Sequence, residues 1–254
     1  MRSSHLEAGG HRLETWSEGP DGSQGPTLVF LHEGLGSVEQ WRDFPQKLAQ
    51  ATGLGAFAYS RAGYGRSSSI QLPRPVRYMH DEARLLPQIL SAAGIAKPIL
   101  VGHSDGASIA ILAAGSGAPA LALVLEAPHV FAEEAGLASI ARARDAYAKT
   151  DLRARLARYH DDVDAAFLGW NGAWLDPAFK EWNIEASLPA IHAPVLIIQG
   201  EDDEYGTQKQ LEAIQRGAGG PVTVELLPRC GHAPHRERPQ ETLAAMTRFI
   251  QSLS

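Results

Sequence analysis

The stretch Pro98-Ile99-Leu100-Val101-Gly102-His103-Ser104-Asp105-Gly106-Ala107 carries an apolar run directly into the pattern Gly-x-Ser-x-Gly. Small residues continue from Ala107 to Gly115 and favour a helix. A serine on such a strand-to-helix turn takes a strained backbone conformation, and glycines two residues to either side avoid clashes there. The sequence therefore predicts that the Ser104 hydroxyl stands clear of a sheet. It also places the backbone N–H of Asp105 at a helix N-terminus, where that N–H can stabilise a developing oxyanion.

Apolar runs alternate with helical periodicity along most of the chain. A hairpin turning at Gly9-Gly10 is predicted first. Further strands are predicted at 27–32, 56–60, 121–126, 194–199 and 222–227, and helices at 80–93, 207–216 and 239–253. Strands that alternate with helices are typical of a mostly parallel α/β sheet covered by helices on both faces.

The interval 129–189 breaks this alternation, because helical periodicity continues there without strands and ends in a cluster of aromatic residues. We interpret it as a helical cap inserted into a core formed by residues 1–128 and 190–254. Its apolar inner face would then line a substrate pocket. The candidate pocket residues in the cap are Trp170, Trp174 and Trp182, together with His129 at its start. The alternative is that these aromatic side chains only bury the inserted helices against the core.

Bulk properties limit the possible partners. The formal net charge of −6 and the lack of a basic stripe argue against nucleic acid. No apolar run is long enough to cross a bilayer, and Met1-Arg2-Ser3-Ser4-His5-Leu6-Glu7 lacks the apolar core of a signal peptide. The single cysteine, Cys230, fits a reducing compartment, so we expect a cytoplasmic protein. No histidine or cysteine cluster has the spacing of metal ligands, so neither a metal nor a cofactor is expected. The expected partner is a small-molecule substrate, and the sequence does not indicate the oligomeric state.

A serine nucleophile needs a base, and the base needs a group that orients it. The candidate base is His232, which follows Gly231 directly after the last predicted strand. The chain has 10 histidines, so this position at the carboxyl edge of the sheet distinguishes His232 from the others. Its rival is His235, three residues later.

The orienting acid is expected at the end of the strand between the serine and the histidine. Gly200-Glu201-Asp202-Asp203-Glu204 offers four carboxylates at that point. We favour Asp203, three residues after the glycine, with Asp202 as the second choice. The remaining carboxylates fit a solvated acidic turn.

The chain resembles the α/β-hydrolase superfamily over nearly its whole length. Four features carry the resemblance: the strand-to-helix turn, the mid-chain insertion, the terminal Gly-His, and the order Ser104, Asp203, His232. The resemblance implies an eight-stranded, mostly parallel sheet with a helical cap. A few members, zearalenone lactonase among them, place the acid at the end of the strand after the nucleophile helix. In this chain that position is Glu126, which stays the alternative acid.

The resemblance also implies a second oxyanion donor in the loop His32-Glu33-Gly34-Leu35-Gly36. We assign the oxyanion hole to the N–H groups of Gly34 and Asp105, with the Glu33 N–H as the competing donor. Glu33 stands where the family has glycine. Its carboxylate must turn away, pair with an arginine such as Arg61, or contact substrate. With Leu35, Glu33 completes the candidate pocket.

These residues predict a serine hydrolase that cleaves a carboxylic ester or a lactone through an acyl-enzyme intermediate. Ser104 argues against dehalogenases and epoxide hydrolases of the superfamily, which use an aspartate nucleophile. The same residues also serve carbon–carbon bond hydrolysis of ring-cleavage products and iminopeptidase-like amide cleavage. A ligand receptor that retains the triad is the alternative outside enzymes.

Overall fold

The apolar runs of the sequence form the strands of one sheet. The computed structural model describes residues 4–20 and 25–253. Residues 1–3, which begin the stretch for which no signal peptide is expected, lie outside the described residues. Within the described part the strands are β1 (Ser4–Ala8), β2 (His11–Glu18), β3 (Pro26–Leu31), β4 (Gly55–Tyr59), β5 (Lys97–His103), β6 (Ala122–Glu126), β7 (Val195–Gly200) and β8 (Val222–Leu227).

The strand order in this sheet is β1-β2-β4-β3-β5-β6-β7-β8. The pairs β1–β2 and β2–β4 are antiparallel, and the other neighbouring strands are parallel. The expected eight-stranded, mostly parallel sheet is therefore confirmed, although the sheet is mixed because the N-terminal hairpin joins it antiparallel.

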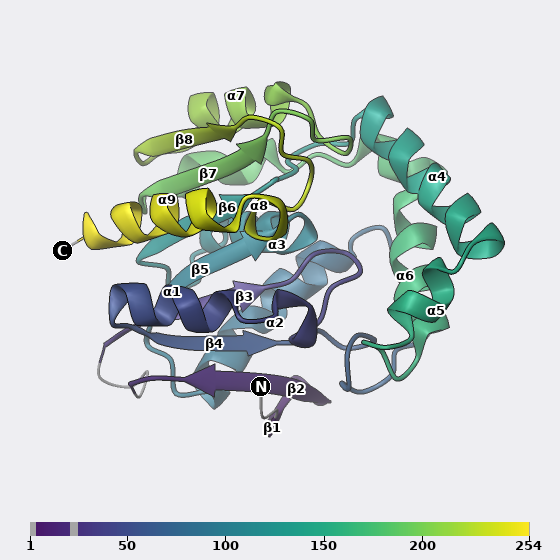
Figure 1. The fold of residues 1–254 in the computed structure, drawn as a ribbon, viewed down its shortest axis with the longest axis horizontal. Coiled ribbons are helices and arrows are strands. Elements are labelled where there is room, and N and C mark those ends of the chain that lie inside the picture. Colours follow the sequence, from purple (N-terminus) through teal and green to yellow (C-terminus); the bar gives the residue numbers. More distant parts are fainter. Residues whose placement is uncertain (1–3, 21–24, 254) are drawn as a thin grey trace.

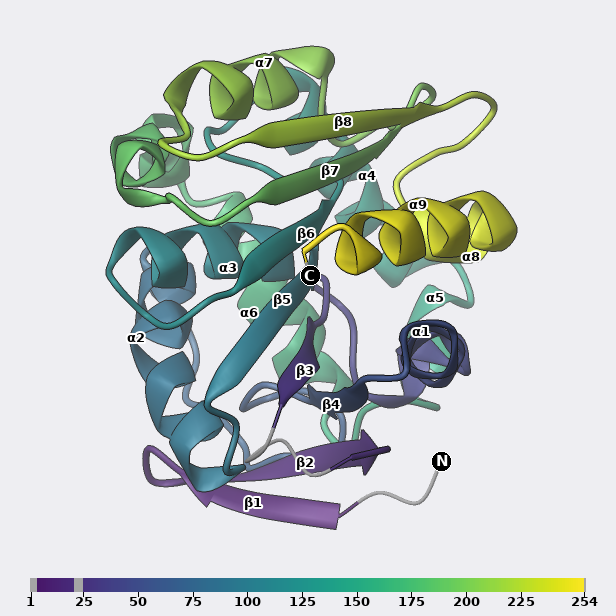
Figure 2. The same ribbon diagram turned by 90° about the vertical axis from the view of Figure 1, so that its left-hand side faces the viewer.

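Helices cover both faces of the sheet (Figures 1 and 2). One face carries α1 (Phe44–Thr52), α8 (Pro234–Glu237) and α9 (Pro239–Gln251). The other carries α2 (Tyr78–Ala92), α3 (Asp105–Gly115) and α7 (Gln208–Gly217). A short 3-10 helix, η1 (Glu39–Trp41), precedes α1.

Side chains of the central strands alternate between two apolar cores. In β3, Leu28 and Phe30 join the core under α1 and α9, whereas Val29 and Leu31 join the core under α2 and α3. Successive side chains of a strand point to opposite faces, so a continuous apolar run is buried on both sides. Burial on both sides holds the parallel strands in place in the sheet. The residues that follow their carboxyl ends therefore lie together at that edge.

The segment between β6 and β7 begins beyond the carboxyl ends of the parallel strands (Figure 1) and ends against α3 and α7, where its last 3-10 helix packs. It contains α4 (Glu134–Lys149), α5 (Leu152–Leu156), α6 (Val163–Trp174), η2 (Pro177–Glu181) and η3 (Glu185–Ala190). The Asp162 side chain caps α6 by accepting a hydrogen bond from the Ala165 N–H at 2.9 Å. In the described part of the chain, no helix has the length and apolar character needed to span a membrane.

Candidate active site

Ser104 sits on a strained turn between β5 and α3, with φ 52° and ψ −116°. The flanking glycines make this turn possible. A Cβ on Gly102 would lie 2.6 Å from the Ala107 nitrogen, and one on Gly106 would lie 1.9 Å from the Leu31 carbonyl oxygen. The Ser104 N–H donates to the Glu126 carbonyl at 2.9 Å, which ties the turn to the end of β6. The geometry is that of a strained serine turn held by close-packed backbone, with Ser104 itself buried at the wall of the pocket.

Asp203 and His232, which come from the ends of β7 and β8, meet above the same edge of the sheet. Both carboxylate oxygens of Asp203 lie 2.9 Å from Nδ1 of His232. The carboxylate also accepts hydrogen bonds from Gln199 Nε2 at 2.6 Å and from the Tyr205 N–H at 2.8 Å. Because Asp203 occupies Nδ1, the other ring nitrogen of His232 is available for a proton from Ser104, which lines the same pocket.

The two partners shift each other's pKa. Burial lowers the pKa of His232, but the hydrogen bond and negative charge of Asp203 raise it above its ordinary value. Burial raises the pKa of Asp203, and the hydrogen bond and charge of His232 bring it below the ordinary value. The pair therefore favours an ionised aspartate that can stabilise a protonated imidazole.

The alternative acids lie elsewhere. Asp202 is exposed, and its backbone N–H donates to the Cys230 carbonyl at 2.9 Å. Glu126 is buried and pairs with His235: one carboxylate oxygen accepts from the His235 N–H at 3.0 Å and lies 2.9 Å from Nδ1. The structure thus brings Asp203 to His232 and leaves Glu126 with the rival histidine.

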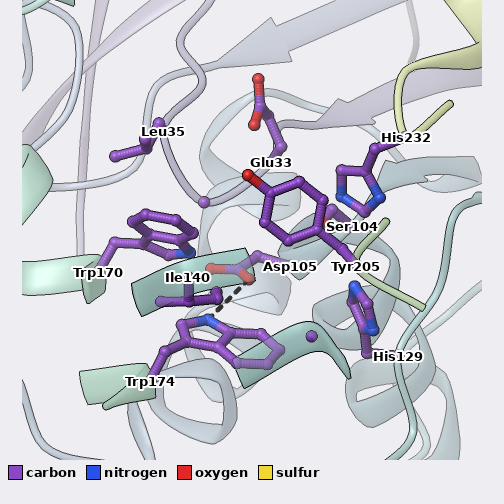
Figure 3. Close-up of a pocket in the computed structure, with 12 residues that line it drawn as sticks. Glu33, Leu35, Ser104, Asp105, His129, Ile140, Trp170, Trp174, Tyr205 and His232 are labelled. Carbon is purple, nitrogen blue, oxygen red and sulfur yellow. Dashed lines mark hydrogen bonds between the residues drawn. The ribbon is translucent and has the colours of Figure 1, made fainter. Parts of the chain in front are cut away.

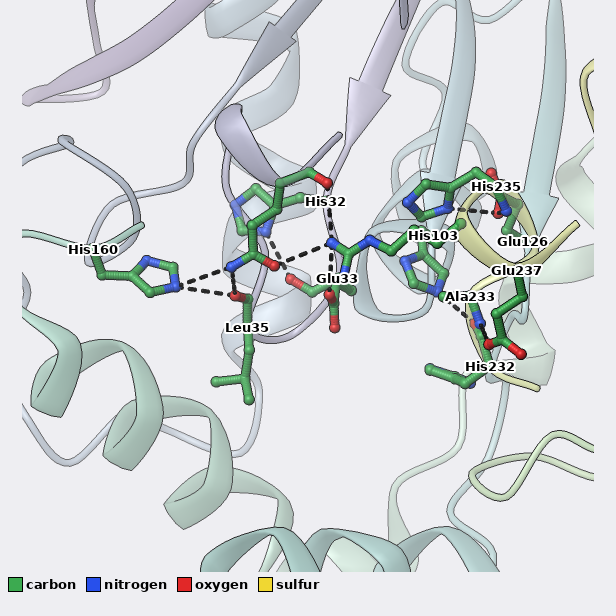
Figure 4. A network of polar contacts seen from close by, with 12 residues as sticks. His32, Glu33, Leu35, His103, Glu126, His160, His232, Ala233, His235 and Glu237 are labelled. Atoms are coloured by element: carbon green, nitrogen blue, oxygen red, sulfur yellow. Dashed lines mark hydrogen bonds and ion pairs between the residues drawn. The ribbon is translucent and has the colours of Figure 1, made fainter. Parts of the chain in front are cut away.

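Two further side chains hold the backbone that carries His232. Glu237 accepts hydrogen bonds from the Gly231 N–H at 2.7 Å and the Ala233 N–H at 3.1 Å, one on each side of the histidine. His103 Nε2 donates to the His232 carbonyl at 2.7 Å. Figure 4 shows the contacts of Glu237 with Ala233 and of His103 with His232, together with the Glu126–His235 pair. Sequence reasoning missed both positioning contacts.

The candidate oxyanion donors are two backbone N–H groups. Within residues 4–20 and 25–253, neither the Gly34 nor the Asp105 N–H donates a hydrogen bond to another residue. Gly34 has no room for a side chain, because a Cβ there would lie 2.1 Å from Trp170 Nε1. Both N–H groups are therefore available at the pocket wall that contains Ser104.

The Glu33 carboxylate pairs with an arginine, but not with the one suggested from the sequence. Glu33 Oε1 lies 3.6 Å from Arg236 Nη2. Arg61 instead donates to the main-chain carbonyls of His32 and Glu33. Burial raises the pKa of Glu33, but Arg236 and the nearby histidines bring it below the ordinary value. Glu33 is therefore an anion next to the oxyanion loop, partly balanced by Arg236.

The Asp105 side chain lies on the pocket floor and connects the core to the cap. Its carboxylate accepts hydrogen bonds from the Tyr78 hydroxyl and from Trp174 Nε1, the latter at 3.2 Å, and lies 4.0 Å from Arg61. Burial raises the pKa of Asp105, while Arg61 opposes this shift. The contact with Trp174 ties α6 to the residue that follows Ser104 (Figure 3).

The pocket brings together most of the predicted residues (Figure 3). Trp182 lies outside this lining, stacked on Phe179 with ring centroids 5.2 Å apart. Sequence reasoning missed Tyr205, whose ring lies 4.6 Å from His232. The lining residues are Glu33, Gly34, Leu35, Ser104, Asp105, His129, Gly136, Ile140, Trp170, Trp174, Tyr205 and His232.

Two other titratable groups near the site are electrically neutral. Burial and the neighbouring His232 lower the pKa of His129 to about 4. Burial and the nearby carboxylate of Glu237 raise the pKa of Cys230 to about 12, so its thiol is a poor nucleophile. Ser104 is therefore the stronger candidate for nucleophile.

Known proteins resemble this chain over most of its length. A family model described as "Alpha/beta hydrolase family" matches residues 28–245. A Salmonella paratyphi A protein named 2-succinyl-6-hydroxy-2,4-cyclohexadiene-1-carboxylate synthase is 25% identical over 257 residues, covering 89% of this chain and 94% of that protein.

Solved structures share the fold. A proline iminopeptidase of Mycobacterium smegmatis has a TM-score of 0.75 at 19% identity, covering 99% of this chain and 98% of that one. A structure described under novel epoxide hydrolases from metagenomes of hot environments has a TM-score of 0.77 at 21% identity, covering 98% of each chain. Likeness at these identities concerns the architecture, so the reaction must be argued from the site.

Proposed function

Since the chain belongs to the alpha/beta hydrolase family, we propose that it is a serine hydrolase that cleaves a carboxylic ester or a lactone. The observation that carries this proposal is the hydrogen bond between Asp203 and Nδ1 of His232, at 2.9 Å. His232 and Ser104 both line the same pocket. This arrangement supports a base, oriented by Asp203, in the same pocket as the Ser104 hydroxyl on its strained turn.

The proposed reaction has two steps. His232 accepts the Ser104 proton while the serine oxygen bonds to the substrate carbonyl carbon, and the Gly34 and Asp105 N–H groups stabilise the resulting oxyanion. The ester C–O bond then breaks, and the protonated His232 gives its proton to the departing alkoxide. In the second step His232 takes a proton from water, whose oxygen bonds to the acyl carbon. The bond between Ser104 Oγ and the acyl carbon then breaks, and the protonated His232 returns its proton to Ser104 Oγ. The products are an acid and an alcohol, or one hydroxy acid from a lactone.

The charges in the pocket favour a substrate without carboxylate groups. Among the described residues that line the pocket, the charged side chains are Glu33 and Asp105, and none is lysine or arginine. A carboxylate on the substrate would lie near these two carboxylates, and the arginines beside them, Arg236 and Arg61, already face Glu33 and Asp105. Trp170, Trp174 and Ile140 supply apolar surface for an acyl chain or a ring.

Cleavage of a carbon–carbon bond is the second candidate. It rests on the same serine, acid and histidine, which also serve that reaction. The name of the Salmonella paratyphi A relative describes the synthesis of a cyclohexadiene carboxylate with a succinyl group. Such a molecule carries two carboxylates, and the acidic pocket of this chain does not suit it. Ester or lactone hydrolysis therefore remains our first choice. The cytoplasmic location also stays a proposal, supported by the single cysteine.

The test is a panel of neutral aliphatic esters, aromatic esters, lactones, ring-cleavage products and aminoacyl amides. Purified protein is compared with Ser104→Ala, and a fluorophosphonate probe reports labelling of the serine. We expect multiple turnover on at least one ester or lactone, lost in Ser104→Ala together with labelling. A single burst without turnover would support the receptor class instead. Turnover confined to ring-cleavage products or amides would replace the ester proposal.

A further inference from the structure

His160 reaches from the cap into the loop that carries the candidate oxyanion donor. It follows α5 and is 5% exposed. Its Nδ1 accepts a hydrogen bond from the Gly65 N–H at 2.9 Å, and its Nε2 lies 3.0 Å from the Leu35 carbonyl oxygen. A backbone N–H can only donate and a carbonyl can only accept, so these contacts require the neutral tautomer with its proton on Nε2.

The Leu35 carbonyl belongs to the residue directly after Gly34. It accepts a second hydrogen bond from Gln40 Nε2 at 2.8 Å. Gln40 Oε1 in turn accepts from Arg236 Nη2 at 3.1 Å, and the same guanidinium faces Glu33 at 3.6 Å. Figure 4 shows this connected set, which runs from the cap through the oxyanion loop to the loop of His232.

We propose that His160 is a positioning residue of the oxyanion hole. By holding the Leu35 carbonyl, the imidazole fixes the Leu35–Gly36 peptide, whose N–H donates to the Glu33 carbonyl at 3.1 Å. The Glu33 carbonyl belongs to the same peptide as the Gly34 N–H, so this chain of contacts helps to set the direction of that N–H. The inference rests on the proposed function, because it assumes that this N–H receives the oxyanion. A donor misplaced by less than an ångström loses much of its value in the transition state.

A purely structural role for His160 would be to anchor the cap. However, the cap has a neighbouring anchor that does not involve the imidazole, since the Asp161 N–H donates to the Gly65 carbonyl at 3.0 Å. Trp174 provides another through its bond to Asp105. Loss of the imidazole should therefore leave the cap attached while the Leu35 carbonyl loses one of its two donors.

Two variants separate the two contacts of His160. In His160→Gln the amide reaches about as far as Nε2 and can still donate to the Leu35 carbonyl. In His160→Asn the shorter amide lies near the Nδ1 position and can accept from the Gly65 N–H, but it does not reach Leu35. Each variant thus keeps one of the two contacts, and both variants carry a neutral amide.

The experiment measures the rate of Ser104 labelling by a fluorophosphonate, whose phosphoryl oxygen needs the oxyanion hole but no particular acyl group. It also measures kcat and KM on the best ester of the panel, and thermal unfolding. We expect His160→Asn to label and turn over about 10-fold to 100-fold more slowly with KM nearly unchanged, and His160→Gln to stay within about 3-fold of wild type.

Equal behaviour of the two variants, or a change in KM alone, would overturn the inference while leaving the hydrolase proposal standing. A loss in His160→Asn that matches a fall in its unfolding temperature, with His160→Gln equally unstable, would also overturn it. Failure of the wild-type protein to label at Ser104 would instead refute the proposed function, and the inference with it.

Discussion

Replacement of Asp203 by asparagine tests the central contact of the site. The Asp203 carboxylate receives three donors: Nδ1 of His232, Nε2 of Gln199 and the N–H of Tyr205. Asparagine has nearly the same shape, but it offers one acceptor oxygen to these donors and carries no charge. It therefore weakens the hold on the imidazole and removes the anion that stabilises its protonated form.

We expect kcat to fall by about 10³-fold to 10⁴-fold, as for the corresponding change in serine proteases. At about 1.4 kcal/mol per tenfold, this corresponds to about 4 to 5.5 kcal/mol of lost transition-state stabilisation. Initial rates on an active ester at the plateau of the pH profile measure the loss. Thermal unfolding shows whether the variant is folded.

The chain offers a matched control one residue earlier. Asp202→Asn makes the same chemical change on an exposed side chain, and its rate should stay within about 2-fold of wild type. A second comparison is Glu126→Gln, which alters the carboxylate bonded to His235. If Asp203→Asn kept its activity within tenfold of wild type, or if Glu126→Gln lost more, the assignment of the acid would be wrong.

Two further outcomes follow from the geometry. First, Gly106→Ala should lower stability by about 2 kcal/mol or more, and Tm by about 4–8 °C, because its Cβ would meet the Leu31 carbonyl oxygen at 1.9 Å. Gly172→Ala, where a Cβ meets nothing within 4 Å, should leave Tm unchanged or higher, and similar Tm values for the two variants would contradict the packing argument. Second, kcat/KM should rise with pH as His232 loses its proton. Burial lowers the pKa of this histidine, but Asp203 raises it by more, so the net shift is upward. The rise of kcat/KM should therefore be centred above about pH 6.5 in wild type and at a lower pH in Asp203→Asn. A limb at the same pH in both proteins would count against the coupling.

The sequence allowed the sheet and its edge to be predicted, because their signals are local. Two-sided apolar runs mark parallel strands, and Gly-x-Ser-x-Gly marks the turn that follows one of them. The strand and helix limits agree with the structure to within about two residues. Helix α1 was not predicted, since its stretch is short and begins with Phe44-Pro45.

Side-chain partners across the edge could not be predicted in the same way. Glu126 ends β6 beside the last loop, which carries both histidines, and the path of that loop brings His235 to the Glu126 carboxylate. The sequence likewise indicated an arginine for Glu33. Whether this is Arg61 or Arg236 depends on contacts between segments far apart in the chain. Such side-chain pairings are set by tertiary packing, so they leave no periodic pattern in the sequence.

The position of the inserted helices has a consequence for redesign. Ser104, Asp203 and His232 all follow core strands, whereas much of the apolar wall comes from the segment between β6 and β7. Replacing these helices with helices from another protein should change which substrate fits the pocket, while the three residues of the proposed triad stay in place. Such a chimera would need one inherited feature, a hydrogen-bond donor in place of His160 that reaches the Leu35 carbonyl.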